Sequence, residues 1–433
     1  MKIVYFTHSL QSCWNHGNAH FLRGVLRELA AAGHHVRALE PQGAWSLENL
    51  LRDHGPAGLE PFRRNYPDLS VETYDPAADP VDLAGDADLV IVHEWNDPAL
   101  AATLGRARLQ GARFKLLFHD THHRAVSDPE AIRAFDLSGF DGVLAFGEAL
   151  SAVYRRWGWG DRVWTWHEAA DTRLFHPPAQ ETAREGLVWI GNWGDGERTE
   201  ELETFLFRPA QQAELPLDIY GVRYPAEALA TLDRYGVRYH GWAPNAAAPE
   251  IFARHMATVH VPRRFYTTML PGIPTIRVFE ALACGIPLVS APWQDSEALF
   301  RPGQDFLFAG EGAEMTAHLR DLAHDAAGDL VDRHAAALEL VAVIGHEGFQ
   351  PPAEAEHGAH REAGLHQPAG HERPLGEDEP LLLVGVFQVA DVVEAGVRRV
   401  VDRQKHLAQR RHDRALGEVH HEQGGDEPHD PVD

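Results

Sequence analysis

Cysteine, positive charge and long apolar runs are all scarce in this sequence of 433 residues. Only Cys13 and Cys284 are present, so the chain has neither a disulfide framework nor a CxxC motif, and a reducing cytoplasm is the expected compartment. The formal net charge of −25 argues against nucleic acid or an anionic membrane as the main partner. No run of about 18 apolar residues is available to cross a membrane, and the opening apolar run is too short for a signal peptide.

The composition that remains is typical of a folded protein, with 44% hydrophobic residues, 11 Trp and 19 Phe. Short apolar runs alternate with helical or polar stretches, beginning with a strand–helix–strand unit whose helix ends at Gly33. Such alternation predicts parallel strands joined by crossover helices. In the first part of the chain we expect strands at 2–6, 35–39, 88–92, 114–118, 142–146 and 162–166.

The same pattern restarts after a linker that contains Pro177 and Pro178. Here we expect strands at 187–190, 217–220, 237–240, 257–261 and 286–290, the last of which should close the series. The sequence therefore predicts an α/β protein with two Rossmann-like domains, an N-terminal one at 1–177 and a C-terminal one at 178–329. Two such domains would face each other across a cleft, which is the favoured place for a ligand.

The composition changes after about Asp329. Residues 330–433 contain no Trp, Tyr, Cys or Met, and they are rich in His, Glu and Arg. Such a segment can hardly build a core, so we predict a tail of low order, either disordered or translated in a shifted reading frame. Its histidines are irregularly spaced and no cysteine accompanies them, which disfavours a metal-binding tail.

One helix in the second domain carries the strongest functional pattern. Thr275 is a natural N-cap, and Gly285 is a natural stop. A helix that begins after a Gly/Pro loop offers free backbone N–H groups, such as that of Ile276, to a diphosphate. Arg277 and Glu280 are three residues apart, so the first could bind phosphate while the second accepts hydrogen bonds from ribose hydroxyls. A simple surface ion pair between these two residues is the alternative.

The stretch Glu280-Ala-Leu-Ala-Cys-Gly-Ile-Pro287 resembles the nucleotide-sugar helix of family 4 GT-B glycosyltransferases, especially their spore-maturation CgeB-like branch. The resemblance extends over about residues 1–325. It implies a GT-B, hexosyltransferase-like enzyme without a metal or other cofactor, in which Glu280 contacts the ribose of the donor. The family pattern has a second glutamate where this chain has Gly272, which leaves the donor-sugar contact and the stereochemistry open.

Further candidates surround the expected donor. Residues 12–19 look like the family's first loop, which closes over the donor phosphates, and Gly17 and Asn18 are the candidates there. The loop that leads to Arg198 is neither GxGxxG nor a Walker motif, so NAD and ATP are not indicated. Arg198 could neutralise the leaving diphosphate or simply be solvated. Arg263 and Arg264 follow a strand, and we expect one to bind phosphate and the other only to form an ion pair.

His119 follows a strand of the first domain and resembles the family's histidine beside the transferred sugar. It could hydrogen-bond sugar hydroxyls or move a proton, with Asp120 as a second polar candidate. Metal binding by His119, His122 and His123 is the less favoured alternative. A weaker expectation is that the pair His93-Glu94 lines the acceptor side.

We therefore expect transfer of a sugar from a nucleotide sugar to an unknown acceptor, which could be a glycan, a lipid or a small molecule. His119, Glu280 and Asp120 are the catalytic candidates. A nucleotide-sugar epimerase and a non-catalytic nucleotide-binding module are the alternatives on the same fold. The stretch Trp166-His-Glu-Ala-Ala-Asp171 nearly matches the zinc-protease motif HExxH, but Asp171 replaces the second histidine, so a protease is excluded.

Overall fold

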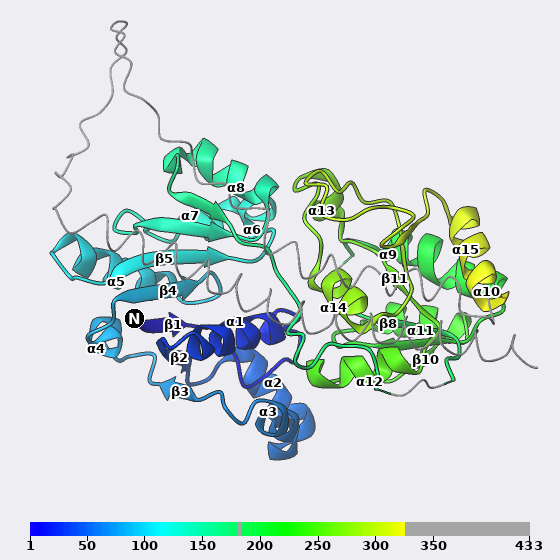
Figure 1. Ribbon diagram of the computed structural model, residues 1–433, viewed down its shortest axis with the longest axis horizontal. Helices are drawn as coiled ribbons and strands as arrows, with labels where there is room; N and C mark the ends of the chain where they lie inside the picture. The colour runs from blue at the N-terminus through cyan, green and yellow to red at the C-terminus, as the bar shows by residue number, and fades with distance from the viewer. Residues whose placement is uncertain (180–182, 195, 325–433) are drawn as a thin grey trace, which may run out of the picture.

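A computed structural model describes residues 1–179, 183–194 and 196–324, and these form two lobes that lie side by side (Figure 1). Each lobe is a parallel sheet covered by helices, which confirms the predicted α/β class. The first sheet ends with Thr165 and the second begins with Leu187, so the passage between them contains the predicted boundary at 177. That boundary remains a prediction, and the predicted tail at 330–433 lies outside the described residues.

The first sheet has seven strands in the order β3-β2-β1-β4-β5-β6-β7, all paired in parallel. The order reverses between the neighbours β1 and β4, and ligands of such sheets bind at the carboxyl ends beside this point. The strands are β1 (Lys2–Phe6), β2 (His35–Pro41), β3 (Val71–Tyr74), β4 (Leu89–His93), β5 (Lys115–Asp120), β6 (Gly142–Ala145) and β7 (Val163–Thr165).

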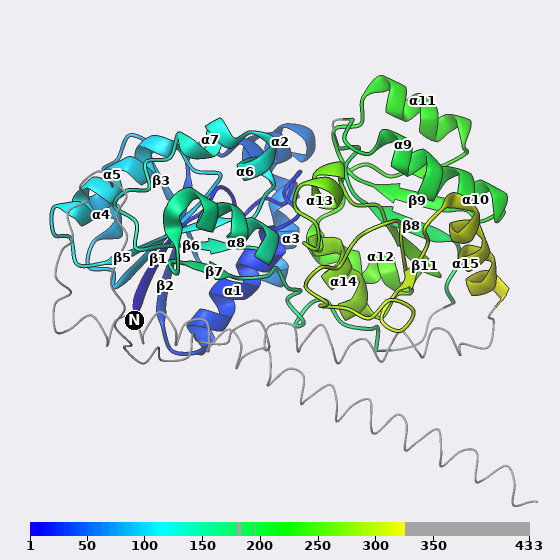
Figure 2. The ribbon, with the colours of Figure 1, turned by 90° about the horizontal axis from the view of Figure 1, so that it is seen from above.

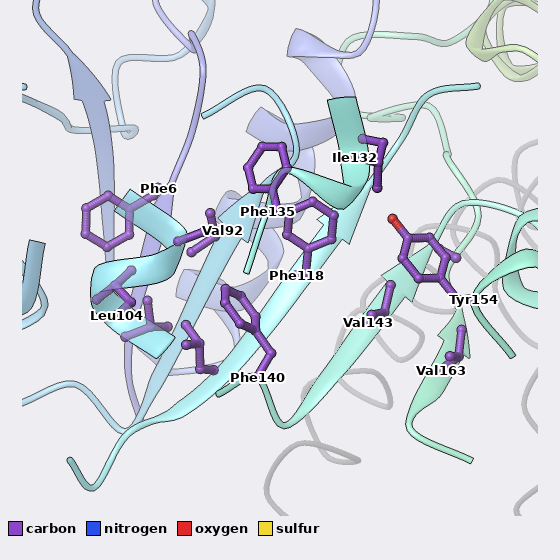
Figure 3. Packing of buried hydrophobic residues seen from close by; sticks show 14 of the residues in the cluster. Phe6, Val92, Leu104, Phe118, Ile132, Phe135, Phe140, Val143, Tyr154 and Val163 are labelled. Carbon is purple, nitrogen blue, oxygen red and sulfur yellow. The ribbon is translucent and has the colours of Figure 1, made fainter. Parts of the chain in front are cut away.

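The helices of the first lobe bury one apolar face against this sheet. Helix α1 shows why: its leucines recur at helical spacing and are buried, and Gly33, with φ 86°, follows its end. On the other side of the sheet, Phe118, Phe135 and Phe140 pack together in the core (Figure 3). The helices are α1 (Ala19–Ala31), α2 (Trp45–His54), η1 (Pro56–Leu59), α3 (Glu60–Asn65), α4 (Pro80–Ala84), α5 (Pro98–Leu109), α6 (Arg124–Ser127), α7 (Pro129–Arg133), α8 (Glu148–Tyr154) and η2 (Arg155–Trp159).

The second sheet has six parallel strands in the order β10-β9-β8-β11-β12-β13, and its order reverses in the same way between β8 and β11. The expectation that the strand after Ile286 closes the series was wrong. A further edge strand follows it, and its two residues are only partly covered, so no apolar run marks it. The strands are β8 (Leu187–Ile190), β9 (Leu217–Tyr220), β10 (Arg238–Tyr239), β11 (Ala257–His260), β12 (Leu288–Ser290) and β13 (Leu307–Phe308).

The helices of the second lobe include two that lie on the side facing the first lobe, α13 and α14 (Figures 1 and 2). No helix in the described part of the chain is long and apolar enough to cross a membrane. The helices are α9 (Thr199–Leu202), η3 (Glu203–Phe207), α10 (Arg208–Gln212), α11 (Ala226–Arg234), η4 (Asn245–Ala247), α12 (Ala248–Ala253), α13 (Arg264–Thr268), α14 (Ile276–Cys284) and α15 (Gly312–His324).

Helix α14 begins and ends where the sequence indicated. Gly285 follows it in the left-handed conformation, with φ 64° and ψ 31°. Thr275 occupies the N-cap position, as expected. The expected side-chain cap was wrong, because the Thr275 side chain makes no capping hydrogen bond. Its hydroxyl lies 3.4 Å from Nε2 of His260 instead. The threonine hydroxyl therefore leaves the first amide groups of α14 to other acceptors.

Candidate functional site

The first loop of the chain packs directly on the beginning of α14. A Cβ atom on Gly17 would lie in ordinary contact with the Ile276 side chain, at 3.4 Å, so this part of the loop lies against the first residue of α14. The Asn245 side chain donates a hydrogen bond of 3.1 Å to the carbonyl of Gly17, and the Asn192 side chain bonds that of Asn15. Gly17 and Ile276, which were predicted to contact the same diphosphate, are thus brought together from different lobes.

Glu280 is completely buried, and it contacts two basic side chains. Arg277 forms an ion pair with it, and Nδ1 of His20, from α1, lies 2.9 Å from its Oε1 atom. The His20 ring packs on Phe175 with 4.3 Å between ring centroids. Burial alone would raise the pKa of Glu280, but Arg277 and His20 outweigh it and hold this pKa below its usual value. Arg277 and Glu280 therefore face the same place, as predicted, and here they bind each other.

A second buried carboxyl group, Glu168, lies beside this pair and was missed by the sequence analysis. Its side chain is 4% exposed, and it forms hydrogen bonds with the Asn18 side chain and the backbone amide of Ile276. Burial, followed by repulsion from Glu280, raises the pKa of Glu168 well above its usual value. The Glu168 side chain thus lies at the beginning of α14. The only sequence signal was a glutamate in the passage between the two domains.

Arg198 is the most deeply held cation of the site. Its guanidinium donates hydrogen bonds to two carbonyls, at 2.9 Å to Val261 and 2.6 Å to Asn192, and stacks over the Trp189 ring. Burial, followed by repulsion from Arg263, lowers the pKa of Arg198. Two carbonyls bring no negative charge, so this half-buried cation favours an incoming anion. Arg198 is thus held by the protein backbone, and its role beside a diphosphate stays a prediction.

Arg263 and Arg264 have different surroundings, as expected. On the surface, Arg264 forms a bidentate ion pair with Glu201, in which Nε and Nη2 lie 2.8 and 3.0 Å from the two carboxylate oxygens. Arg263 is more buried and lies 3.3 Å from Glu197. It is also close enough to Arg198 to lower the pKa of that residue, and Arg277 acts in the same sense. Arg263 therefore belongs with Arg198 and Arg277 to one group of cations, whereas Arg264 is paired on the surface.

The histidine and aspartate at the end of β5 are both completely buried. His119 contacts the Tyr5 hydroxyl and stacks on Trp166 with 5.0 Å between ring centroids. Burial lowers the pKa of His119 to about 3, so the ring is neutral at neutral pH. Asp120 accepts a hydrogen bond of 2.7 Å from the Tyr154 hydroxyl, and burial raises its pKa. Both side chains are packed in the interior of the first lobe, and their catalytic role remains a prediction.

The neighbouring polar residues at this edge form a packed cluster. His93 bonds Thr121 at 3.0 Å, and Glu94 is paired with Arg124. Burial, followed by repulsion from Asp120, raises the pKa of Glu94. Within residues 1–179, 183–194 and 196–324, no three His, Cys, Asp or Glu side chains are arranged to hold a metal ion. The metal alternative for the histidines therefore gains no support from their arrangement.

This architecture, two doubly wound parallel sheets with the α14 side of one turned toward the other, is the GT-B fold. The Anabaena protein Alr3699/HepE, solved with UDP and glucose, superimposes with a TM-score of 0.55 at 16% identity, covering 80% of this chain and 95% of that chain. BGT of phage T4, solved with UDP-glucose, superimposes with a TM-score of 0.51 at 14% identity, covering 79% and 96%. Both likenesses confirm the predicted fold.

Sequence comparison adds the class of the second lobe, because residues 198–340 match the family described as glycosyl transferase-like. No curated protein matches the chain. The chain thus has a GT-B fold whose second lobe carries a glycosyltransferase-like domain, as the resemblance implied. The finer assignment to a CgeB-like branch remains a prediction.

Proposed function

We propose that the protein transfers a sugar from a nucleotide diphosphate sugar to an acceptor. The observation that carries this proposal is the convergence of Arg198, Arg263 and Arg277 near the beginning of α14. Three cations and the backbone amides of a helix N-terminus are the groups that bind a diphosphate. The family match supports the reaction type, and the complexes of HepE and BGT with UDP or UDP-glucose support the donor class.

In this reaction the cations act mainly on the leaving group. Negative charge grows on the departing diphosphate as its bond to the sugar breaks, and fixed guanidinium groups stabilise that charge without having to reorganise. Arg198 is suited to this role because two carbonyls and the Trp189 ring hold it in place. We propose no covalent intermediate, metal or other cofactor.

Glu168 and Glu280 have different roles in this proposal. Glu280 stays ionised, so it can accept hydrogen bonds from the ribose hydroxyls, as the resemblance implies. Glu168 contacts the first amide of α14, and the diphosphate would displace it. The raised pKa of Glu168 favours this exchange, because it reflects an environment that disfavours the carboxylate form.

Calorimetric titration tests the proposal most directly. We expect one of UDP, GDP or dTDP to bind the purified protein, and the matching nucleotide sugar to be hydrolysed or to donate its sugar. Arg277→Gln should weaken nucleotide binding by about a hundredfold, since a charged hydrogen bond to phosphate is worth roughly 1.5–3 kcal/mol. Arg264→Gln is the matched control, because that side chain is paired on the surface. A folded sample that binds none of these nucleotides would refute the proposal.

The acceptor is proposed only by class, as a glycan, a lipid or a small molecule met in the cytoplasm. The phage T4 β-glucosyltransferase is described as a DNA modifying enzyme, which makes nucleic acid the obvious comparison. A formal net charge of −25 disfavours that acceptor here, because DNA-binding proteins depend on cationic contacts to phosphate. Incubation of the active protein with DNA and a labelled donor should therefore give no labelled DNA.

A further inference from the structure

Asn192 lies at the carboxyl edge of the second sheet, where the strand order reverses. It follows strand β8 by two residues, in the loop that leads to Arg198. Its side chain bonds to the first loop, and its backbone carbonyl bonds to Arg198. One residue thus contacts both the loop that covers the beginning of α14 and the cation proposed to act on the leaving group.

The two ends of the Asn192 side chain have different partners. Its Oδ1 atom accepts a hydrogen bond of 2.9 Å from the backbone amide of Val222, in the loop after β9. Its Nδ2 group donates a hydrogen bond to the side-chain oxygen of Asn15, in the first loop. An asparagine amide donates only through its nitrogen and accepts only through its oxygen, so both bonds form in a single orientation. The Asn192 side chain therefore holds Asn15 from a fixed position.

Asn15 is suited to this contact by its backbone conformation. Its φ of 50° lies in the left-handed region, which asparagine adopts more readily than most other residues. Two residues further along the chain, Gly17 lies against Ile276. The bond between Asn15 and Asn192 therefore ties the part of the first loop that covers the beginning of α14 to the second lobe.

The backbone of Asn192 sets the direction of the Arg198 guanidinium. Its carbonyl accepts a hydrogen bond of 2.6 Å from Nη2, and the carbonyl of Val261 accepts one of 2.9 Å from Nη1. The loop fits closely around this side chain, since a Cβ atom on Gly194 would lie only 3.0 Å from Nε. A guanidinium is planar and rigid, so movement of either carbonyl turns the whole group. A shift of residue 192 is therefore passed directly to Arg198.

We propose that Asn192 is a positioning residue that couples closure of the first loop to the orientation of Arg198. This inference rests on the proposed function, in which Arg198 stabilises the charge of the departing diphosphate. With the loop closed, Asn15 and Val222 hold the two ends of the Asn192 side chain, and its carbonyl holds the guanidinium. With the loop open, the restraint from Asn15 is lost. Leaving-group stabilisation is then strongest when the loop covers the nucleotide.

Asn245 offers a comparison, because it also holds the first loop. Its side chain donates a hydrogen bond of 3.1 Å to the carbonyl of Gly17, and its backbone amide lies 3.3 Å from the sulfur of Cys13. Among the residues that the structure describes, no hydrogen bond joins Asn245 to Arg198. Loss of the Asn245 side chain should therefore loosen the loop without turning the guanidinium, whereas loss of the Asn192 side chain should do both.

A mutant cycle tests the coupling through turnover of the matching nucleotide sugar. Asn192→Ala should lower kcat about tenfold and change nucleotide affinity less than about threefold, because its effect on the reaction passes through Arg198. In an Arg198→Gln background the same change should lower kcat less than about twofold. Asn245→Ala should keep its full effect in that background. Asn65→Ala, at a half-buried asparagine bonded to a carbonyl within α3, should change neither value.

Fluorine NMR follows the orientation of Arg198 without turnover. Its guanidinium lies 4.9 Å from the centroid of the Trp189 ring, so its rotation should shift the resonance of 5-fluorotryptophan at that position. This resonance is identified as the one absent from Trp189→Phe. Asn15→Gly removes the side chain and still accepts the positive φ. It should move the Trp189 resonance in the wild type and leave it in place in the Asn192→Ala variant.

Two results would overturn this inference. One is an equal effect of Asn192→Ala on kcat with and without Arg198, and the other is a Trp189 resonance that does not respond to Asn15→Gly. The proposed function can fail separately. A wild type that neither binds nor turns over a nucleotide sugar refutes that function, while a Trp189 resonance that follows Asn15→Gly through Asn192 still supports the coupling.

Discussion

Gly272 shows how a single backbone position limits the chemistry of the site. Its φ of 92° lies in the region that favours glycine, and a side chain there would collide with the hydroxyl of Ser296. The glutamate that the family pattern places at this position cannot be accommodated by this loop. The departure noted in the sequence is therefore a property of the local backbone, and the donor sugar must be held by other residues.

Two glycine variants separate the effect of the backbone from that of the collision. Gly272→Ala should lower the free energy of unfolding by about 3 kcal/mol, because it combines an unfavourable φ with a clash. Gly303→Ala should cost only about 1 kcal/mol, since Gly303 also has a positive φ but open space around it. Denaturant unfolding measures both values. Equal costs would show that Ser296 moves aside freely.

Glu280 gives a prediction about donor affinity at the same scale. Glu280→Gln should weaken nucleotide binding about tenfold, because a neutral amide is a weaker acceptor for the ribose hydroxyls than a carboxylate. Glu200→Gln, an exposed change in the first turn of α9, is the control and should have no effect. Calorimetry with the best nucleotide decides this. Binding equal to that of the wild type would mean that Glu280 serves only to hold Arg277 and His20.

At the scale of elements, Asp218 on β9 holds one edge of the second sheet together. It accepts hydrogen bonds from Arg238 on β10 and contacts His240 and His255, at 2.5 and 3.0 Å. Burial opposes its ionisation, but these three partners outweigh burial and lower its pKa to about 2. One carboxylate thus ties β9 to β10 and to the end of α12.

This cluster predicts how the stability of the protein depends on pH. A carboxyl group with a lowered pKa adds stability above its usual value of 3.8, and that contribution is lost as the pH falls toward 2. Asp218→Asn should remove about 2 kcal/mol at neutral pH and flatten the acid side of the stability curve. Asp233→Asn, at an exposed position, is the control. If Asp218→Asn loses stability at acid pH as steeply as the wild type does, Asp218 is not the source of this pH dependence.

The elements also show what sequence patterns can and cannot predict. The bounds of β1, β8 and β9 match the expected strands because these segments are short, mostly apolar and mostly buried. Strands β3 and β13 were missed because they lie at sheet edges and are largely uncovered. Short apolar runs reveal burial on both faces, which edge strands do not have.

For the site, local motifs predicted the charged residues of α14 and the strand-end arginines. They could not predict Glu168, because the burial and the partners of this side chain arise only when distant segments pack. A glutamate in a linker is ordinary in sequence. Its raised pKa is a property of the folded molecule.

At the scale of the whole molecule, Glu297 connects the two lobes. It follows β12 in the second lobe, accepts a hydrogen bond of 2.8 Å from the backbone amide of Glu148, and lies 2.7 Å from Nε2 of His167. Burial raises the pKa of Glu297 to about 7, and the charges of Glu148 and Asp295 act in the same sense. Burial lowers the pKa of His167 to about 4, so the pair is held together by a proton on Glu297.

The contact between the lobes should therefore weaken with rising pH. A raised pKa adds stability that is fully present below the usual value of 4.5 and is lost as the pH rises through about 7. Small-angle scattering should show a larger radius of gyration at pH 8.5 than at pH 6. Glu297→Gln keeps the hydrogen bonds without a titrating group, so its radius should not change over this range. A wild-type radius independent of pH would contradict this.

The position of the first loop has a kinetic consequence. Gly17 packs against Ile276, and the Asn192 side chain contacts that of Asn15, so contacts with the second lobe hold this loop over the beginning of α14. In the proposed function, a nucleotide must displace the loop to reach the first amides of α14. We therefore expect the observed rate of nucleotide binding to level off at high nucleotide concentration, at the rate at which the loop opens, and stopped-flow fluorescence measures this rate.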